Sequence, residues 1–303
     1  MNKMDGEKNE LRIPDKPLSL SLRLSRVKGL KWLLLFVPLG YIMILMFFSI
    51  FDFFKLSVFN DDGFTLEYLS HIFTTPVYLK VLWLTVKIAF LVTLFSLIFA
   101  YPVAYMLVKT ESGLWKKIIF AAVLIPFWIS LLVRTYAWTI LLQKNGVINK
   151  LLMELGLISE PLSLLYNTTG VMIGMTHILL PYMVLSLYSV MDGIDQHLLQ
   201  AAQGMGARPW QAFRQIFFPL SLPGVLAGSL LVFVMGLGYY ITPALLGGAN
   251  TTMIAMLIES NINTTLNWHL SSALALVLFT ATLLVLFVAL FLMRGNPVLK
   301  ELD

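Results

Sequence analysis

Three ionisable side chains lie inside long apolar stretches of the chain: Lys87, Arg134 and His177. A charge in such surroundings is costly, so each is a functional candidate by default. Arg134 and His177 together could serve an enzyme embedded in the membrane. Alternatively, Arg134 could line a pathway across the membrane, or point outward and pair with Asp52, Glu67 or Glu259. His177 is more simply interpreted as a hydrogen-bonded residue that packs two helices together.

The signatures of known catalytic centres are missing from the sequence. The four histidines, His71, His177, His197 and His269, have neither His-x-x-x-His nor His-Glu-x-x-His spacing, so a metal site is not indicated. The chain has no cysteine and no Gly-x-Ser-x-Gly turn, which removes the usual nucleophiles. It also lacks the Gly-x-x-x-x-Gly-Lys-[Ser/Thr] loop that holds the phosphates of ATP. We therefore expect no catalytic residue, bound cofactor or metal in this chain.

The composition is that of an integral membrane protein. Of 303 residues, 58% are hydrophobic and 12% charged, against about 25% charged in a typical soluble domain. The net charge of +5 does not indicate nucleic acid, because much of it lies in the first 31 residues, ahead of the first apolar run. A basic segment in that place follows the positive-inside rule, and it is too long for a signal peptide.

Six stretches are long and apolar enough to cross a bilayer as helices: 32–50, 81–108, 118–142, 171–190, 225–241 and 274–293. The sequence thus predicts an all-α membrane protein with both termini in the cytoplasm, since that assignment places most of the 21 Lys and Arg inside. The expected parts are a cytoplasmic tail (1–30), a first span with an outer loop (31–79), a core (80–293) that includes a cytoplasmic loop (192–224), and a second tail (294–303). Apolar residues at helical spacing predict short interfacial helices near 147–155 and 253–258.

The cytoplasmic loop before the fifth span predicts a compact knob of two helices. Residues 195–203 can form the first helix, and Gly204 and Gly206 can adopt positive φ where it ends. Pro209 suits the first turn of a second helix, 210–218, which Pro219 and Pro223 should prevent from running straight into the next span. The small residues of the knob allow close approach, while Leu199, Trp210 and Phe213 offer apolar surface to a partner.

The spacing within this knob resembles the coupling loop of ABC-importer permeases. That family's pattern is Glu-Ala-Ala, three residues, Gly, nine residues, Ile, one residue, Leu-Pro. This chain has Gln200 in place of the Glu and Phe218 in place of the Leu. The resemblance implies that the knob inserts into a groove of a separate ATPase subunit and transmits its closure to the membrane helices. The implied coupling residues are Gln200, Ala201, Ala202, Gly206, Pro209, Trp210, Phe213, Ile216 and Pro219.

Further segments look like the spermidine/putrescine-type permeases: PFWISLLVRTYAW (126–138), NGVIN (145–149), LPYMVLSLY (180–188) and GLGYYITPALLGG (236–248). The resemblance implies a type I importer permease with six helices in a bacterial inner membrane. It also implies a second homologous permease, an ATPase dimer that binds ATP and Mg²⁺, and an external substrate-binding protein.

Residues that could line a substrate pathway are mostly aromatic: Trp128, Arg134, Tyr136, Trp138, Tyr182, Tyr239 and Tyr240. Aromatic faces suit a cationic polyamine through cation–π contacts, but the predicted spans contain no carboxylate to accompany them. An opine, an aminophosphonate or another zwitterionic or anionic solute is therefore the alternative cargo. A secondary transporter driven by an ion gradient is disfavoured, because no Asp or Glu lies within the spans to bind the ion.

Overall fold

The computed structural model describes residues 28–60 and 62–294, so nearly all of the two predicted tails (1–30 and 294–303) lies outside the described residues. The chain divides into two units, residues 1–53 and 54–303, and each is described by itself. Apart from helices, the described part has only β1 (Phe59–Asn60) and β2 (Gly63–Phe64), which pair antiparallel. The all-α prediction is confirmed.

Helix α2 (Lys28–Lys55) makes up the described part of the first unit and extends two residues beyond it. It is apolar on all sides and buries none of its spanning window inside the chain. A helix with this pattern is stable when its surroundings are apolar as well. The predicted span at 32–50 is therefore confirmed as a helix.

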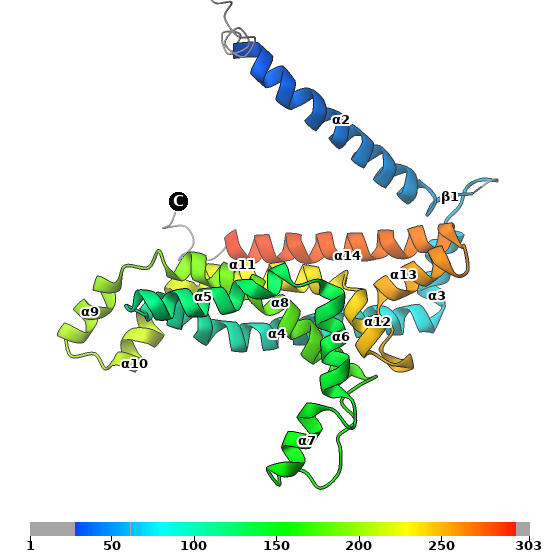
Figure 1. Ribbon diagram of the computed structural model, residues 1–303. Coiled ribbons are helices and arrows are strands. Elements are labelled where there is room, and N and C mark those ends of the chain that lie inside the picture. Colours follow the sequence, from blue (N-terminus) through cyan, green and yellow to red (C-terminus); the bar gives the residue numbers. More distant parts are fainter. Residues whose placement is uncertain (1–27, 61, 295–303) are drawn as a thin grey trace, which may run out of the picture. The chain divides into compact units, whose positions relative to one another are not determined.

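The second unit is a bundle built on α4 (Pro76–Lys109), α8 (Thr168–Met191), α11 (Phe218–Leu237) and α14 (Trp268–Arg294) (Figure 1). Glycines let these helices approach closely, as is usual where lipid provides no hydrophobic drive for association. A Cβ atom on Gly236 of α11 would lie 3.3 Å from the Cβ of Ala89 on α4. A Cβ on Gly224 would lie 3.0 Å from the Cβ of Val190 on α8. The predicted spans at 81–108, 171–190 and 274–293 are confirmed as continuous helices.

The predicted span at 118–142 is wrong as a single helix. It consists of α5 (Gly113–Trp128) and α6 (Leu131–Leu142), which are separated by Ile129 and Ser130. The two directions differ by 103° when α6 is taken together with the following α7. Pro126 lies in the last turn of α5, Ile129 is extended, and Ser130 has φ −51° and ψ 138°, which is not helical. Hydropathy is averaged over the stretch, so it does not register a two-residue break. The described part holds five helices able to cross a membrane, or six with this pair counted as one span.

The short helices lie at opposite ends of the bundle (Figure 1). Helices α9 (Gln196–Gly204) and α10 (Pro209–Ala212) lie at one end, with α3 (Glu67–Thr74), α12 (Ile241–Leu246), a 3₁₀ turn (Ala249–Thr251) and α13 (Ile254–Asn263) toward the other. Helix α7 (Val147–Glu154) follows α6 away from the bundle. The short helices predicted near 147–155 and 253–258 are confirmed as α7 and α13.

A buried asparagine holds α7 in place. Asn149 is fully buried, its amide nitrogen donates to the carbonyls of Gln143 and Leu162, and its amide oxygen accepts from the N–H of Leu162 at 2.9 Å. These bonds tie α7 to the residues that precede it and to those that follow it. The side chain thus takes the place of secondary structure in this loop.

Candidate functional site: a knob at one end of the bundle and a polar cluster within it

The first helix of the knob is fixed at both ends by local sequence. Asp195 caps α9, since its carboxylate accepts from the N–H of His197 at 2.9 Å. At the other end Gly206 has φ +93°, and the N–H of Ala207 donates to the carbonyl of Ala202 at 3.0 Å. This is the left-handed helix end that glycine favours, so the prediction for Gly206 is confirmed. Gly204 stays within the helix.

The second helix of the knob runs directly into the fifth span, so the expected interruption at Pro219 and Pro223 is wrong. Helix α10 continues into a π-helical turn (Phe213–Phe217) and then into α11, giving one helix from Pro209 to Leu237. In the π turn the N–H of Phe218 donates to the carbonyl of Phe213, five residues back. The hydrogen-bond ladder is thus already shifted before Pro219, which lacks an N–H, enters the first turn of α11.

An aromatic ladder joins this segment to α4. The ring of Phe213 is stacked on Trp210 at 5.5 Å and meets the edge of Tyr105 at 5.4 Å between centroids. Phe217 is fully buried, and the centroid of its ring lies 5.0 Å from that of Tyr105. A movement of the knob must therefore displace the last turns of α4, because these rings are close-packed.

The predicted coupling residues divide by exposure. Leu199 and Ala202 are buried, so the expectation that Leu199 offers surface to a partner is wrong. The surface is made instead by Met205, which is 85% exposed, and by Leu198. Met205 was missed by sequence reasoning, although its place between Gly204 and Gly206 marked it as the tip of the turn. The exposed predicted residues are Gln200, Ala201, Gly206, Pro209 and Trp210, and the half-buried ones are Phe213, Ile216 and Pro219.

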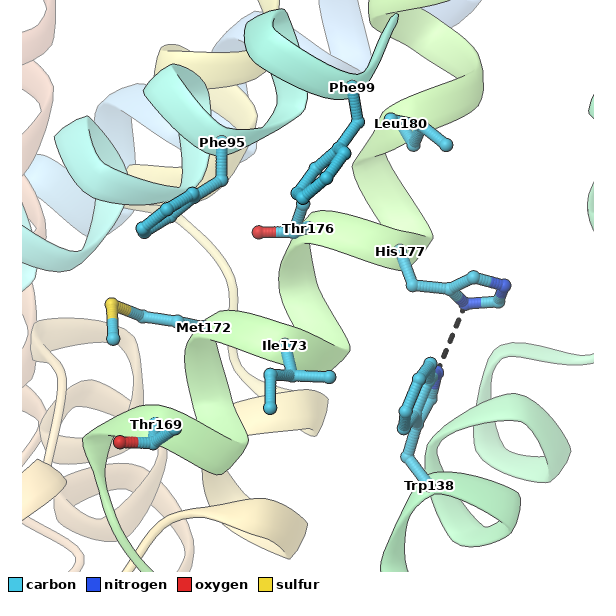
Figure 2. A pocket seen from close by; sticks show the side chains of 9 residues that line it. All are labelled: Phe95, Phe99, Trp138, Thr169, Met172, Ile173, Thr176, His177 and Leu180. Atoms are coloured by element: carbon cyan, nitrogen blue, oxygen red, sulfur yellow. Dashed lines mark hydrogen bonds between the residues drawn. The ribbon is translucent and has the colours of Figure 1, made fainter. Parts of the chain in front are cut away.

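Within the bundle, Trp138 of α6 and His177 of α8 form a hydrogen-bonded pair (Figure 2). The indole N–H donates to Nδ1 of His177 at 3.1 Å. Indole can only donate, so this Nδ1 carries no proton and the ring is neutral with its hydrogen on Nε2. The predicted hydrogen bond of His177 between two helices is confirmed. The other ring nitrogen, Nε2, can therefore donate a hydrogen bond to a ligand.

Arg134 lies one turn before Trp138 on α6 and interacts electrostatically with His177 and with Tyr239, just beyond α11. Its Nε atom is buried and has no hydrogen-bond partner. Within residues 54–60 and 62–294 no carboxylate lies within ion-pair distance of its guanidinium. Pairing with Glu67 or Glu259 is therefore wrong for this structure. Tyr182 lies near Tyr239, so the cluster draws on α6, α8 and the segment after α11.

The other predicted pathway residues are not brought into this cluster. Trp128 ends α5 and is 89% exposed. Tyr136 is 63% exposed, since two residues along a helix turn it about 200° away from Arg134. Tyr240 interacts instead with Glu259. Lys87 is exposed on α4.

A pocket of about 480 Å³ opens beside the Trp138–His177 pair, between α4 and α8 (Figure 2). Its walls are largely apolar, with Phe95 and Phe99 contributed by α4. Thr176 lines it with a buried hydroxyl that has no hydrogen-bond partner. The pocket offers apolar surface for an aliphatic group and very few polar contacts.

Comparison with known proteins gives this arrangement a family. Residues 27–294 match the family described as binding-protein-dependent transport system inner membrane component. The spermidine/putrescine transport system permease protein PotB of Haemophilus influenzae is 32% identical over 277 residues, which cover 89% of this chain and 92% of that protein. PotB of Escherichia coli is 34% identical over 249 residues, covering 82% of this chain and 88% of that protein.

Solved structures agree on the fold. A bacterial ABC transporter involved in the import of the acidic polysaccharide alginate contains a chain that superposes with a TM-score of 0.72 at 17% identity, over 92% of this chain and 99% of that one. A chain of the MetNI methionine ABC transporter gives 0.57 at 18% identity, over 72% and 94%. The family match spans most of the sequence, and the chain belongs to the binding-protein-dependent transport system inner membrane components: it is a permease subunit of an ABC importer, whose ATPase is a separate subunit.

Proposed function

We propose that this importer carries a small organic amine, and that the polyamines spermidine and putrescine are its first candidates. The observation that carries the proposal is the similarity over most of the chain to two permeases named for these compounds. The aromatic rings of the cluster around Arg134, which are Trp138, Tyr182 and Tyr239, support it, because ring faces attract alkylammonium groups by about 0.5–2 kcal/mol.

An amine that also bears a carboxylate or phosphonate is the second candidate. Arg134 favours it, because its buried Nε atom has no hydrogen-bond partner and no carboxylate lies within ion-pair distance of it in the described part of the bundle. His177 favours it as well, because the ring nitrogen that is not bonded to Trp138 is a hydrogen-bond donor. A ligand with an anionic group would satisfy both, since guanidinium binds carboxylate and phosphonate oxygens in a bidentate manner.

Putrescine and ornithine separate the two candidates, because ornithine is putrescine with one carboxylate added. Binding of both, and of spermidine, to the cognate external receptor is measured by calorimetry, and uptake is followed in proteoliposomes. If polyamines are the cargo, the receptor binds putrescine or spermidine and Arg134→Gln leaves their uptake intact or raises it. If the cargo is carboxylated, the receptor prefers ornithine and Arg134→Gln reduces its uptake. A receptor that binds no amine contradicts both.

We also propose that the knob, residues 195–219, docks on the ATPase subunit at the cytoplasmic face. In the assembly this chain pairs with a second homologous permease, an ATPase dimer binds below, and an external receptor delivers the substrate. The exposed tip at Met205 and Gly206 supports this role, together with the aromatic ladder that connects it to α4. Docking at the knob would let ATPase closure move the membrane helices.

Met205→Arg tests the docking. Met205 is 85% exposed, so the change should leave the fold intact while placing charge at the centre of the interface. We expect at least a tenfold loss of ATPase subunit recovered with the permease. Leu155→Arg is the matched control, because Leu155 is 70% exposed and lies at the end of α7 rather than in the knob. Equal recovery in the two variants contradicts docking at the knob.

A further inference from the structure

A second pocket lies where the knob meets α4. It has a volume of about 420 Å³ and is lined by three residues of α4 and three of the segment that follows Arg208. All six carry rings: Tyr101, Pro102, Tyr105, Pro209, Trp210 and Phe213. Tyr101 is fixed by a hydrogen bond to Ser221 at 2.8 Å. The walls are therefore apolar and held in place, and we call this pocket the ring groove.

Three cations lie next to, or one helical turn from, residues that line the ring groove. Lys109 lies one turn beyond Tyr105 on α4, Arg208 precedes Pro209, and Arg214 lies one turn beyond Trp210. All three are exposed, and the single ion pair found among the described residues joins Lys116 and Asp192. On the adjoining segments the acids are Glu111 and Asp195, and Asp195 caps α9. Positive charge thus predominates around an apolar groove.

The ring groove lies beside the ends of two helices that are long and apolar enough to cross a membrane. Helix α4 ends at Lys109, and the continuous 209–237 helix begins at Pro209. Tyr101 lies eight residues before the end of α4, which is about 12 Å along a helix. At a membrane boundary, a lipid can place its headgroup at the end of such a helix and its acyl chain along the side. Tyr and Trp with Lys and Arg at such a boundary are typical of contacts with lipid headgroups.

We propose that the ring groove binds an anionic phospholipid. The headgroup phosphate lies among Lys109, Arg208 and Arg214, and an acyl chain lies against the rings of Tyr101 and Phe213. The same rings connect the knob to α4, so the bound lipid supports the joint through which the ATPase acts. The importer then requires anionic lipid for full activity.

Lipid binding is measured by native mass spectrometry on the complete importer, released from phosphatidylcholine nanodiscs with and without phosphatidylglycerol. The test variant is Lys109→Gln with Arg214→Gln. Its control, Lys116→Gln with Lys117→Gln, removes equal charge at the start of α5. We expect the test variant to retain phosphatidylglycerol about thirtyfold less well than wild type, because each cation near an anionic lipid contributes about a fivefold gain. The control keeps wild-type retention.

Equal phosphatidylglycerol retention in test and control variants overturns the proposal. So does loss of the ATPase subunit from the test variant with lipid retention unchanged, because the cations then serve protein docking. Receptor-stimulated ATP hydrolysis gives a second readout. It should rise with phosphatidylglycerol in wild type and in the control, and stay flat in the test variant. Lipid retention is read directly from mass, so it can be scored even if the proposed cargo is wrong.

Discussion

The Trp138–His177 hydrogen bond defines the polar centre of the bundle at the scale of single residues. It joins α6 to α8 across 39 positions of sequence and fixes the tautomer of the histidine. It also holds α6, which is connected to α5 only through the break at Ile129 and Ser130. The bond thus orients the helix that carries Arg134, and breaking it should loosen that helix.

A double-mutant cycle measures this bond. Trp138→Phe and His177→Phe each leave a half-buried polar group unpaired, so each should lower the free energy of unfolding by roughly 1–2 kcal/mol. The double variant should lose less than the sum, with a coupling energy of about 1 kcal/mol, measured by reversible unfolding in detergent. Trp128→Phe serves as the control, because Trp128 is 89% exposed and should change stability by less than about 0.5 kcal/mol. Strict additivity contradicts the bond.

At the scale of elements, the π turn explains how one helix can serve both the knob and the membrane. It accommodates Pro219 without ending the helix, and it directs Phe213 toward Tyr101 and Tyr105. The wide turn leaves the helix continuous between the exposed tip and the buried packing of α11 against α8. A push on the knob can therefore travel along α11 and across to α4.

Phe213→Ala should uncouple the importer. The change removes the central ring of the ladder but leaves Met205 and the surface of α9 in place. Since Phe213 is only half-buried, the stability cost should stay below the 3–5 kcal/mol typical of a fully buried Phe. We expect normal recovery of the ATPase subunit, with several-fold less substrate transported per ATP hydrolysed in proteoliposomes. Phe213→Leu should restore part of this ratio.

Phe287→Ala is the control for this prediction, because Phe287 is 69% exposed on α14. A transport ratio in Phe213→Ala equal to that of Phe287→Ala shows that the aromatic ladder does not carry the coupling.

At the scale of the whole molecule, the 54–303 unit has two unlike ends, with the knob at one and α3, α12 and α13 toward the other (Figure 1). This polarity suits an importer that meets its ATPase on one face and its receptor on the opposite one. The charge bias of the sequence predicts the direction of the bundle in the membrane, with the knob in the cytoplasm.

Cysteine labelling tests that orientation directly, because the chain contains no cysteine of its own. Single variants Met205→Cys and Leu157→Cys place thiols at residues 85% and 67% exposed, in the knob and in the loop after α7. A membrane-impermeant maleimide should label Leu157→Cys in right-side-out vesicles and Met205→Cys only in inverted ones. The reverse pattern shows that the bundle is inserted the other way round.

The cluster around Arg134 contains some of the pathway residues that the sequence predicted and lacks others. The sequence identified Arg134, Trp138, Tyr182 and Tyr239 by residue type, and the structure brings them together. It named Trp128, Tyr136 and Tyr240 by the same argument, and these lie elsewhere. A helix that is apolar all round has no amphipathic stripe, so its sequence does not tell which face turns inward.

The sequence by itself determined the all-α membrane fold, most of the spans and the turn at Gly206. Each depends on local properties: about 20 apolar residues satisfy a bilayer, and glycine alone adopts positive φ at little cost. Only the tertiary structure decided the break at Ile129, the continuous helix through Pro219, the burial of Leu199 and Ala202, and the Trp138–His177 pair. Those features depend on which distant segments pack against each other, and the spacing of residues along one helix does not encode that.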